Sequence, residues 1–461
     1  MANVSSPSSR QLPQLPSAVL YEIATHLIND LDDEDNHRIT LSTLKSLRLT
    51  CRDVARMTNI NRAMFKSINL HATEDKLQQL LLTGLGPIRP FVRQLNFFPS
   101  PYIPGLSREE FEGILRIHYS GFKFPSRCLP CRRLHDEHAE DVNCLPLSDR
   151  EIVAQFMSYT KSADEDMDLL RDGILPDLWR KEILPLRNVS SIRLCSITRL
   201  RSTQPYIIND QCDMCDVMSS LMNSITGRNG DRLFEAVIRT LISTQLPVEE
   251  LEIGCELENT FQPGWSDRSW RQLNLDKLKT LTINRVPILA RCHPEAMHHD
   301  CATRICAAVI QKVQNTVQNI TLSHGNGLHW SYWANFEWPP VSQLEQSPLR
   351  SVHLHGYYLD AGALADAILL SPRLDKLSLD RCQADDWKTF FNAIRRKPNS
   401  FDFVCFDMWS CVMVSWDFDI KDKDVAVVRP SEETPLQKDL YSYLTQGGEW
   451  TEFLEDVFPS P

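Results

Sequence analysis

The 461-residue chain contains no apolar run close to the ~18 residues that a membrane-spanning helix needs. It is also poor in positive charge, with 49 Lys and Arg residues against 60 Asp and Glu residues and a formal net charge of -11. A surplus of negative charge disfavours a broad surface for phosphate groups. The composition therefore predicts a protein that binds neither membranes nor nucleic acid.

A secretory signal is also missing, because Met1 to Arg10 is polar and Ser-rich and has no apolar stretch. We expect residues 1–10 to be disordered. Without secretion, the 14 cysteines are expected to be reduced thiols rather than disulfides. These observations predict a cytoplasmic or nuclear protein, or one found in both compartments.

Motifs of catalysis are absent. The sequence has no Walker loop, dinucleotide fingerprint, His-Glu-x-x-His or Gly-x-Ser-x-Gly, and Gly84 to Pro87 lacks the other residues of a phosphate loop. Sixteen glycines are few for a fold that holds phosphates in tight loops. We therefore predict that the chain is not an enzyme and binds no cofactor.

Two Cys-x-x-Cys pairs, Cys128 with Cys131 and Cys212 with Cys215, carry ligand types that suit zinc. Only three residues separate Cys131 from the nearest histidine, His135, too few for the loop that brings a second ligand pair back to the ion. The spacing predicts no bound metal. A site assembled from both pairs in three dimensions is the alternative.

Residues 12–70 carry the strongest indication of function in the sequence. They predict a small helical module that docks on a partner. Pro16 sets up the first turn of a helix, and apolar residues follow at helical spacing. A second apolar stripe runs from about Leu41 to Met57. Two short helices cannot bury this much apolar surface against each other, so a partner is expected.

This segment, roughly an eighth of the chain, resembles the F-box, the domain that docks a protein on the Skp-family adaptor and, through it, on a cullin. One departure is the insert Asp30 to His37, where F-boxes have a shorter link. The alternative is a helical cap that packs on the protein's own body. The resemblance places adaptor-facing and helix-packing positions at Leu15, Pro16, Ile23, Leu27, Leu44, Leu47, Cys51 and Arg52. The first six of these are expected to form one apolar surface that is exposed in the isolated chain and buried by the adaptor.

Beyond this segment a six-residue pattern, apolar-x-x-apolar-x-apolar, recurs with helical patterns in the gaps. From Val248 onward the patterns begin 30, 39, 32, 25 and 27 residues apart, close to the period of leucine-rich repeats. The patterns are Val92 to Phe97, Val189 to Leu194, Val248 to Ile253, Leu278 to Ile283, Val317 to Leu322, Leu349 to Leu354, Leu374 to Leu379 and Phe401 to Phe406.

The repeats resemble the leucine-rich-repeat solenoids that are commonly joined to F-boxes, although the Asn that usually follows each strand is missing and the repeat lengths vary. The predicted fold is α/β: an N-terminal three-helix F-box, then an irregular leucine-rich-repeat-like solenoid of short parallel strands alternating with helices. A single α/β domain with a parallel sheet is the alternative.

The predicted boundaries follow from these patterns and from two capping boxes, which begin at Ser107 and Ser148 and open helices outside the repeat pattern. Asp385 or Asp386 is expected to cap a repeat helix. The predicted parts are a disordered N-terminus (1–10), the F-box (11–70), a first repeat-like unit (71–98), a helical insertion (99–187), the solenoid (188–410) and a C-terminal cap (411–461) with an edge strand near Val425 to Val428.

The irregular segment Gly325 to Pro340 holds three tryptophans and is expected to be a plug over the solenoid, with a recognition surface as the alternative. Alternate strand residues face the concave side of such a repeat. These are Asn96, Arg193, Glu252, Thr282, Thr321, His353, Ser378 and Cys405. The candidates for binding a protein target are Trp330, Trp333, His353, Tyr357 and Tyr358.

The resemblance implies a substrate-recognition subunit of a cullin-based ubiquitin ligase of the SCF type. Such a chain holds a target protein near the enzymes that transfer ubiquitin and catalyses nothing itself. A repeat-based scaffold outside ubiquitin transfer and a zinc-stabilised binding module are the alternatives. The sequence does not identify the target.

Overall fold

The protein is described from a computed structural model, which divides it into two compact units: unit 1, Met1–Ile68 with Leu85–Gln94, and unit 2, Asn69–Gly84 with Leu95–Pro461. Residues 85–94, which were predicted to belong to the first repeat-like unit, group with unit 1 instead. The described residues are 17–29, 37–50, 55–100, 102, 105–112, 148–171, 173–195, 216–255, 257, 268–286, 312–313, 315–324, 334–336, 348–355, 357–374, 376–380, 382–396, 403–407, 426–427, 439, 442–443 and 448–457.

Unit 1 is helical and has its own apolar core. Leu44 and Ile60 are fully buried at its centre. Arg48 of α2 contacts two residues further along the chain. Its Nε donates to Asn61 Oδ1 at 3.2 Å, and its guanidinium lies 4.9 Å from the centre of the Phe65 ring. The elements are α1 (Ser17–Asn29), α2 (His37–Thr50), α4 (Thr58–Met64) and the short η2 (Gly86–Phe91).

Among the described residues, the main sheet has ten strands, and its order follows the chain from β1 to β13. All pairings from β3 to β12 are parallel, whereas β13 is antiparallel to β12. The predicted α/β fold with parallel strands is therefore confirmed. The strands are β1 (Ser67–His71), β2 (Gln94–Phe98), β3 (Ser191–Leu194), β4 (Glu250–Ile253), β5 (Thr280–Val286), β6 (Asn319–His324), β8 (Ser351–His355), β10 (Lys376–Asp380), β12 (Phe403–Asp407) and β13 (Ala426–Val427).

Each predicted six-residue pattern coincides with one strand, from β2 to β12. The first apolar residue of the pattern lies just before the strand, and from β2 to β10 it is buried, as Leu349 is before β8. The other two apolar residues, Val352 and Leu354 in this case, alternate with half-buried residues along the strand. The pattern therefore marks the edge and the buried face of each strand.

A second, smaller sheet with the order β11-β9-β7 was not predicted. Its parallel strands are β7 (Ala334–Phe336), β9 (Tyr357–Leu359) and β11 (Gln383–Ala384). β9 follows β8 and β11 follows β10, so each of these two repeats contains a long strand, a short strand and then a helix. The helix that follows β9 is α14 (Ala361–Leu370), and the helix that follows β11 is α15 (Trp387–Arg396).

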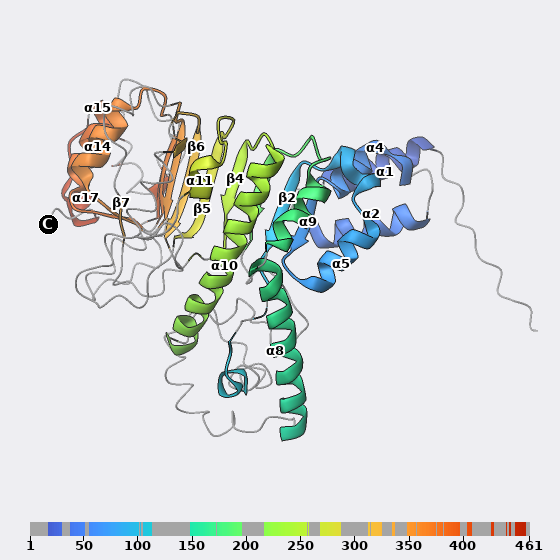
Figure 1. Cartoon of the computed structure of the whole chain (residues 1–461). Helices are drawn as coiled ribbons and strands as arrows, with labels where there is room; N and C mark the ends of the chain where they lie inside the picture. Colours follow the sequence, from blue (N-terminus) through green and yellow to red (C-terminus); the bar gives the residue numbers. More distant parts are fainter. Residues whose placement is uncertain are drawn as a thin grey trace, which may run out of the picture. The chain divides into compact units, whose positions relative to one another are not determined.

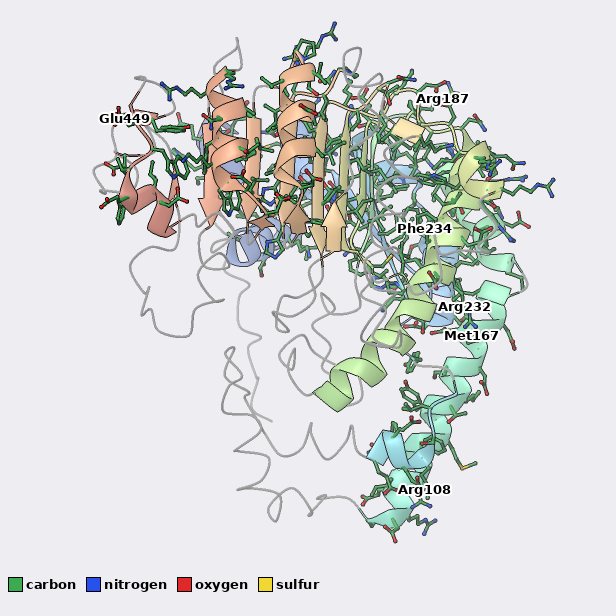
Figure 2. All side chains as sticks on the ribbon, turned by 90° about the vertical axis from the view of Figure 1, so that its left-hand side faces the viewer. Arg108, Met167, Arg187, Arg232, Phe234 and Glu449 are labelled. Carbon is green, nitrogen blue, oxygen red and sulfur yellow. The ribbon has the colours of Figure 1, made fainter. Side chains whose placement is uncertain are left out.

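In unit 2, α14 and α15 stand side by side in front of the strands (Figure 2), and α10 runs beside β4 (Figure 1). The buried apolar residues of these helices pack toward the sheet, among them Phe234, Leu364 and Phe390. None of the described helices is both long and apolar enough to cross a membrane. The remaining helices of unit 2 are α5 (Glu74–Thr83), α8 (Asp149–Arg171), α9 (Ile174–Ile183), α10 (Asp216–Thr244), α11 (Arg268–Gln272) and α17 (Glu452–Val457).

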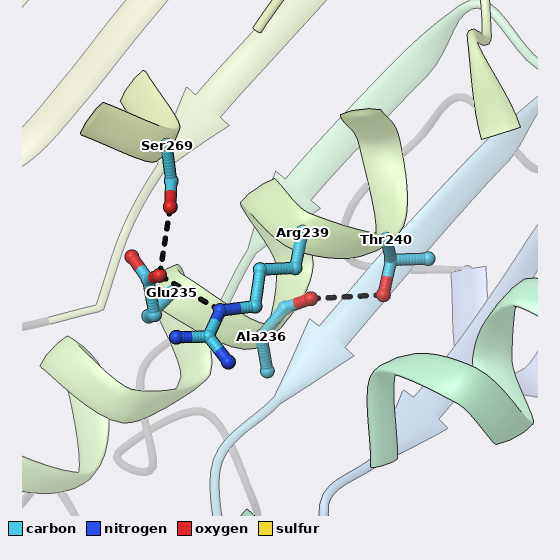
Figure 3. Close-up of polar contacts among 5 residues, drawn as sticks. All are labelled: Glu235, Ala236, Arg239, Thr240 and Ser269. Carbon is cyan, nitrogen blue, oxygen red and sulfur yellow. Dashed lines mark hydrogen bonds and ion pairs between the residues drawn. The ribbon is translucent and has the colours of Figure 1, made fainter. Parts of the chain in front are cut away.

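Polar side chains join consecutive repeat helices. Glu235 of α10 accepts hydrogen bonds from Ser269 Oγ of α11 and from Arg239 Nε of its own helix, each at 2.9 Å (Figure 3). Further along the chain, Lys312 Nζ donates to the carbonyl of Arg271 at 3.1 Å. These contacts fix the spacing between neighbouring repeats in the helical layer.

Asp385 and Asp386 accept hydrogen bonds from the first turns of helices in two different repeats. Asp386 caps α15 by accepting from the Thr389 N–H at 3.0 Å, which confirms one of the two predicted caps. Asp385 instead accepts from the N–H of Ala361 at 2.7 Å, the first residue of α14 in the preceding repeat. Asp385 therefore links two neighbouring repeats.

Both predicted capping boxes are present. Ser107 exchanges hydrogen bonds with Glu110, and Ser148 does so with Glu151 at the start of α8. The hydrogen bonds from Ser148 lower the pKa of the Glu151 carboxyl. Phe111, just after the first box, is fully buried against aromatic side chains of α8.

The last helix of the predicted insertion, α9, has the place of a repeat helix. Its Trp179 is fully buried, and the Trp179 ring lies 4.9 Å from that of Phe97 in β2. At the other end of the repeats, Tyr443 Oη donates to Asn392 Oδ1 at 2.6 Å, and Arg395 donates to the Gly448 carbonyl at 3.2 Å. Part of the predicted C-terminal cap therefore packs on α15.

Candidate functional site

The sheet of unit 2 carries a line of residues that occupy the same position in successive strands. Each lies between two apolar residues of its strand, as Glu252 lies between the buried Leu251 and Ile253. We call this line the polar row. In order of pairing it consists of Arg193, Glu252, Thr282, Thr321, His353, Ser378 and Cys405. The sequence predicted all seven as facing one side, and their register in the sheet is confirmed.

The charges in the polar row neutralise each other. Arg193 Nε lies 2.9 Å from Glu252 Oε2, and Asn284 Nδ2 donates to Glu252 Oε1 at 3.2 Å. Glu252 is only 17% exposed, so this pair is partly shielded from water. The row has hydroxyl, imidazole and paired ionic groups, which suit hydrogen bonding to a protein partner.

The same side of the sheet shows further polar pairing between strands. Asn96 Nδ2 donates to Asn69 Oδ1 at 2.9 Å, and Asn319 Nδ2 donates to Thr280 Oγ1 at 3.3 Å. Asn96 was predicted to face this side, and its side chain is half-buried. The surface is therefore polar along several strands and carries little net charge.

The predicted target-binding residues have different outcomes. His353 is half-buried in the polar row, next to Thr321 and Ser378 in register. Tyr357 is fully buried, so the prediction that it meets a target at the surface is wrong. Tyr358 lies in β9 opposite Asn335 and Gln383, but its side chain is outside the described part, as are Trp330 and Trp333.

Tyr357 is buried because of its place in the repeat. It comes three residues after Leu354, and Cys382 comes three residues after Leu379, one 25-residue period later. Both are buried, and Cys382 Sγ donates to the carbonyl of Leu354 at 3.4 Å. A search of the sequence for Cys as well as Asn, three residues after the last apolar residue of each pattern, would have pointed to Cys382 and its contact with Leu354.

The predicted adaptor-binding residues are only partly exposed. Leu44 is fully buried against Ile60, so the prediction that it belongs to an exposed surface is wrong. Leu27 and Leu47 are half-buried against the same core. Ile23 is exposed at 37%. Leu15, Pro16, Cys51 and Arg52 lie outside the described residues.

Two exposed apolar residues of unit 1 were not among the predicted contacts. Tyr21 of α1 is 55% exposed, and Leu49 of α2 is 85% exposed. Leu49 points away from the core that Leu44 enters, because the two lie five residues apart on one helix. Unit 1 therefore exposes the apolar side chains of Tyr21, Ile23 and Leu49.

Metal ligands do not gather in the part of the chain that the structure describes, where no group of three or more His, Cys, Asp or Glu residues could hold an ion. Cys195, Cys255 and Cys382 are buried. The two Cys-x-x-Cys pairs, Cys128 with Cys131 and Cys212 with Cys215, lie outside the described residues. The expectation that they bind no metal stays a prediction.

No protein-family model matches the chain, and no curated protein is significantly similar to it. The features from which a function can be inferred are therefore the exposed apolar residues of unit 1 and the polar row of unit 2.

Proposed function

We propose that the protein is a substrate-recognition subunit of an SCF-type ubiquitin ligase. In this proposal, the N-terminal helices of unit 1 dock on a Skp-family adaptor and, through it, on a cullin. The repeats of unit 2 hold a protein target. Other subunits transfer ubiquitin, and the chain contributes by raising the concentration of target lysines near them.

The observation that carries this proposal is the N-terminal module. Residues 12–70 resemble an F-box in the order of their motifs. Most of this segment belongs to unit 1, whereas the repeats belong to unit 2. Its helices bury a small core around Leu44 and Ile60, yet leave Ile23 and Leu49 exposed. Exposed apolar side chains of this kind are typical of a surface that a partner covers.

The repeats support the second half of the proposal. Ser351 of β8 pairs in parallel with Lys376 of β10, 25 residues further along the chain. Leu374, Leu377, Leu379 and Cys382 follow the spacing of a leucine-rich repeat with Cys in place of Asn. Solenoids of this class bind proteins on the strand face, where the polar row lies.

A repeat scaffold outside ubiquitin transfer is the second candidate. It is favoured by the burial of Leu44, because a module that fills its own core has less apolar surface left for an adaptor. The two candidates differ in one measurable property, which is binding to a Skp-family adaptor.

Full-length protein is expected to bind a purified Skp-family adaptor with micromolar or tighter affinity. Changing both Leu15 and Pro16 to Ala should weaken binding at least tenfold, about 1.4 kcal/mol, because an apolar anchor and a helix-starting proline are lost. Isothermal titration calorimetry measures both constants.

Leu82→Ala provides the matched control for this experiment, because Leu82 is an 87% exposed leucine of α5 in unit 2. It should leave adaptor binding unchanged. A wild-type chain that shows no adaptor binding at micromolar concentration would reject the proposal in favour of the scaffold.

The polar row is expected to contact the target. His353→Ala should reduce the amount of target that co-purifies with the chain while the free energy of unfolding stays within about 1 kcal/mol, as is usual for a residue outside the core. Quantitative mass spectrometry and urea denaturation measure the two effects. Arg187→Ala, at an exposed residue before β3, is the control. Unfolding of the His353→Ala variant would show that His353 is structural instead.

A further inference from the structure

A buried carboxylate joins α8 to two other segments of unit 2. Asp166 of α8 is 3% exposed. Its Oδ2 accepts from Ser100 Oγ at 2.6 Å, and its Oδ1 accepts from the N–H of Glu74 at 3.0 Å. The partners lie 66 and 92 residues away along the chain, so this side chain is a tertiary contact between distant segments.

The contact to Glu74 replaces a normal helix cap. Thr73 precedes α5, but its side chain does not accept from the helix and instead donates to Asp75 Oδ1 at 2.7 Å. Asp166 therefore satisfies the first N–H of α5 from another helix. Ser100 Oγ also accepts from the N–H of Tyr102 at 3.1 Å, which extends the network into the turn after β2.

The charges around Asp166 are mostly negative. Burial, together with the carboxylates of Asp75 and Glu165, raises the pKa of Asp166 to about 6, although the hydrogen bonds from Ser100 and Glu74 act in the opposite direction. Among the charged or titratable groups on the elements around it are Glu74, Asp75 and Lys76 of α5, His71 of β1, Asp164, Glu165 and Asp168 of α8, and Asp231 and Arg232 of α10.

Two of these groups are cations on helices in contact with α8: Lys76 of α5 and Arg232 of α10. Arg232 of α10 contacts Met167, the residue after Asp166, and the two lie together in Figure 2. On α5, the Lys76 ammonium lies 3.7 Å from Asp75, in an ion pair at the surface. His71 stacks on Phe98, and burial lowers its pKa, which favours the neutral ring. Asp166 is thus buried, and its nearest charged neighbours include the carboxylates of Asp75 and Glu165.

We propose that Asp166 makes a pH-dependent contact that holds α8 against α5 and the turn at Ser100 most firmly when its carboxyl is protonated. The sign follows from linkage. A carboxyl whose pKa is higher in the closed structure than in water stabilises the closed structure at low pH. This stabilisation is lost as the pH rises through about 6, the pKa of the closed state. This inference does not depend on the proposed function.

Hydrogen–deuterium exchange of the full-length protein between pH 5 and pH 7.5 tests the proposal, after correction for the intrinsic exchange rates. The opening constant of the first turn of α5 should be about tenfold larger at pH 7 than at pH 5, as expected for a carboxyl with a pKa near 6 when closed and near 4 when open. Asp166→Asn keeps an acceptor for the Glu74 N–H but cannot ionise, so its opening constant should not change with pH.

Two further variants make the test specific. Asp164→Asn removes an exposed carboxylate of the same helix and should keep the wild-type pH profile. Ser100→Ala removes a hydrogen bond that favours the ionised form, so the midpoint of the profile should move to higher pH. Equal pH profiles for the wild type and Asp166→Asn, or a midpoint that moves to lower pH in Ser100→Ala, would overturn the proposal.

Discussion

Replacing Trp179 with Ala lowers the free energy of unfolding by about 3–5 kcal/mol, the usual cost of removing a large aromatic side chain from a core. Trp179 is fully buried between α9 and the sheet, where its ring packs edge-on against Phe97. Urea denaturation followed by circular dichroism measures the loss. The effect should be the largest of any single substitution on this face of α9.

The indole N–H of Trp179 has no hydrogen-bond acceptor among the described residues. Packing rather than hydrogen bonding therefore fixes this residue, and Trp179→Phe should cost less than Trp179→Ala. Leu184→Ala, one residue beyond α9 and 55% exposed, should change the free energy of unfolding by less than about 0.5 kcal/mol. Equal losses for Trp179→Ala and Leu184→Ala would contradict the assignment of α9 to the repeat layer.

Leu44→Ala is expected to destabilise unit 1 by about 2–5 kcal/mol, because Leu44 and Ile60 are the two fully buried apolar residues at the centre of its core. Unit 2 should keep its fold, since Leu44 belongs to the other compact unit. Hydrogen–deuterium exchange resolves the two units and should show faster exchange only in peptides from unit 1, residues 17–68 and 85–94.

Leu49→Ala is the matched control for this prediction, because it removes the same side chain from the same helix at a position that is 85% exposed. It should leave the stability of unit 1 unchanged. It should also weaken adaptor binding if Leu49 belongs to the docking surface. Faster exchange throughout both units in Leu44→Ala would show that they do not unfold independently.

The strands were predictable because their signal is repeated and local. Each six-residue pattern places apolar residues at period two, and the spacing of the patterns separates them from chance matches. The register that joins Arg193 to Glu252 and His353 to Ser378 followed from the same positions in each pattern. Helix starts at Ser107 and Ser148 were equally local, since a capping box lies within four residues.

The errors arose where the partner of a residue is distant or where its surroundings have no period. An apolar stripe does not reveal whether a neighbouring helix or another protein covers it, and α4 supplies the Ile60 that covers Leu44. Tyr357 was taken as a surface aromatic because β9 is too short to give a pattern. The contact of Asp166 was not predictable from the sequence, because Glu74, whose N–H it accepts from, lies 92 residues away.

The antiparallel strand β13 has a consequence for how chains behave at high concentration. A sheet of parallel strands ends in a row of unpaired N–H and C=O groups, which another chain can extend. In this protein β13 is two residues long, runs the opposite way and pairs with Cys405 and Phe406 of β12. So short an edge offers little backbone for a further strand. We therefore expect the antiparallel pairing at Cys405 and Phe406 to disfavour end-to-end aggregation at this end of the sheet.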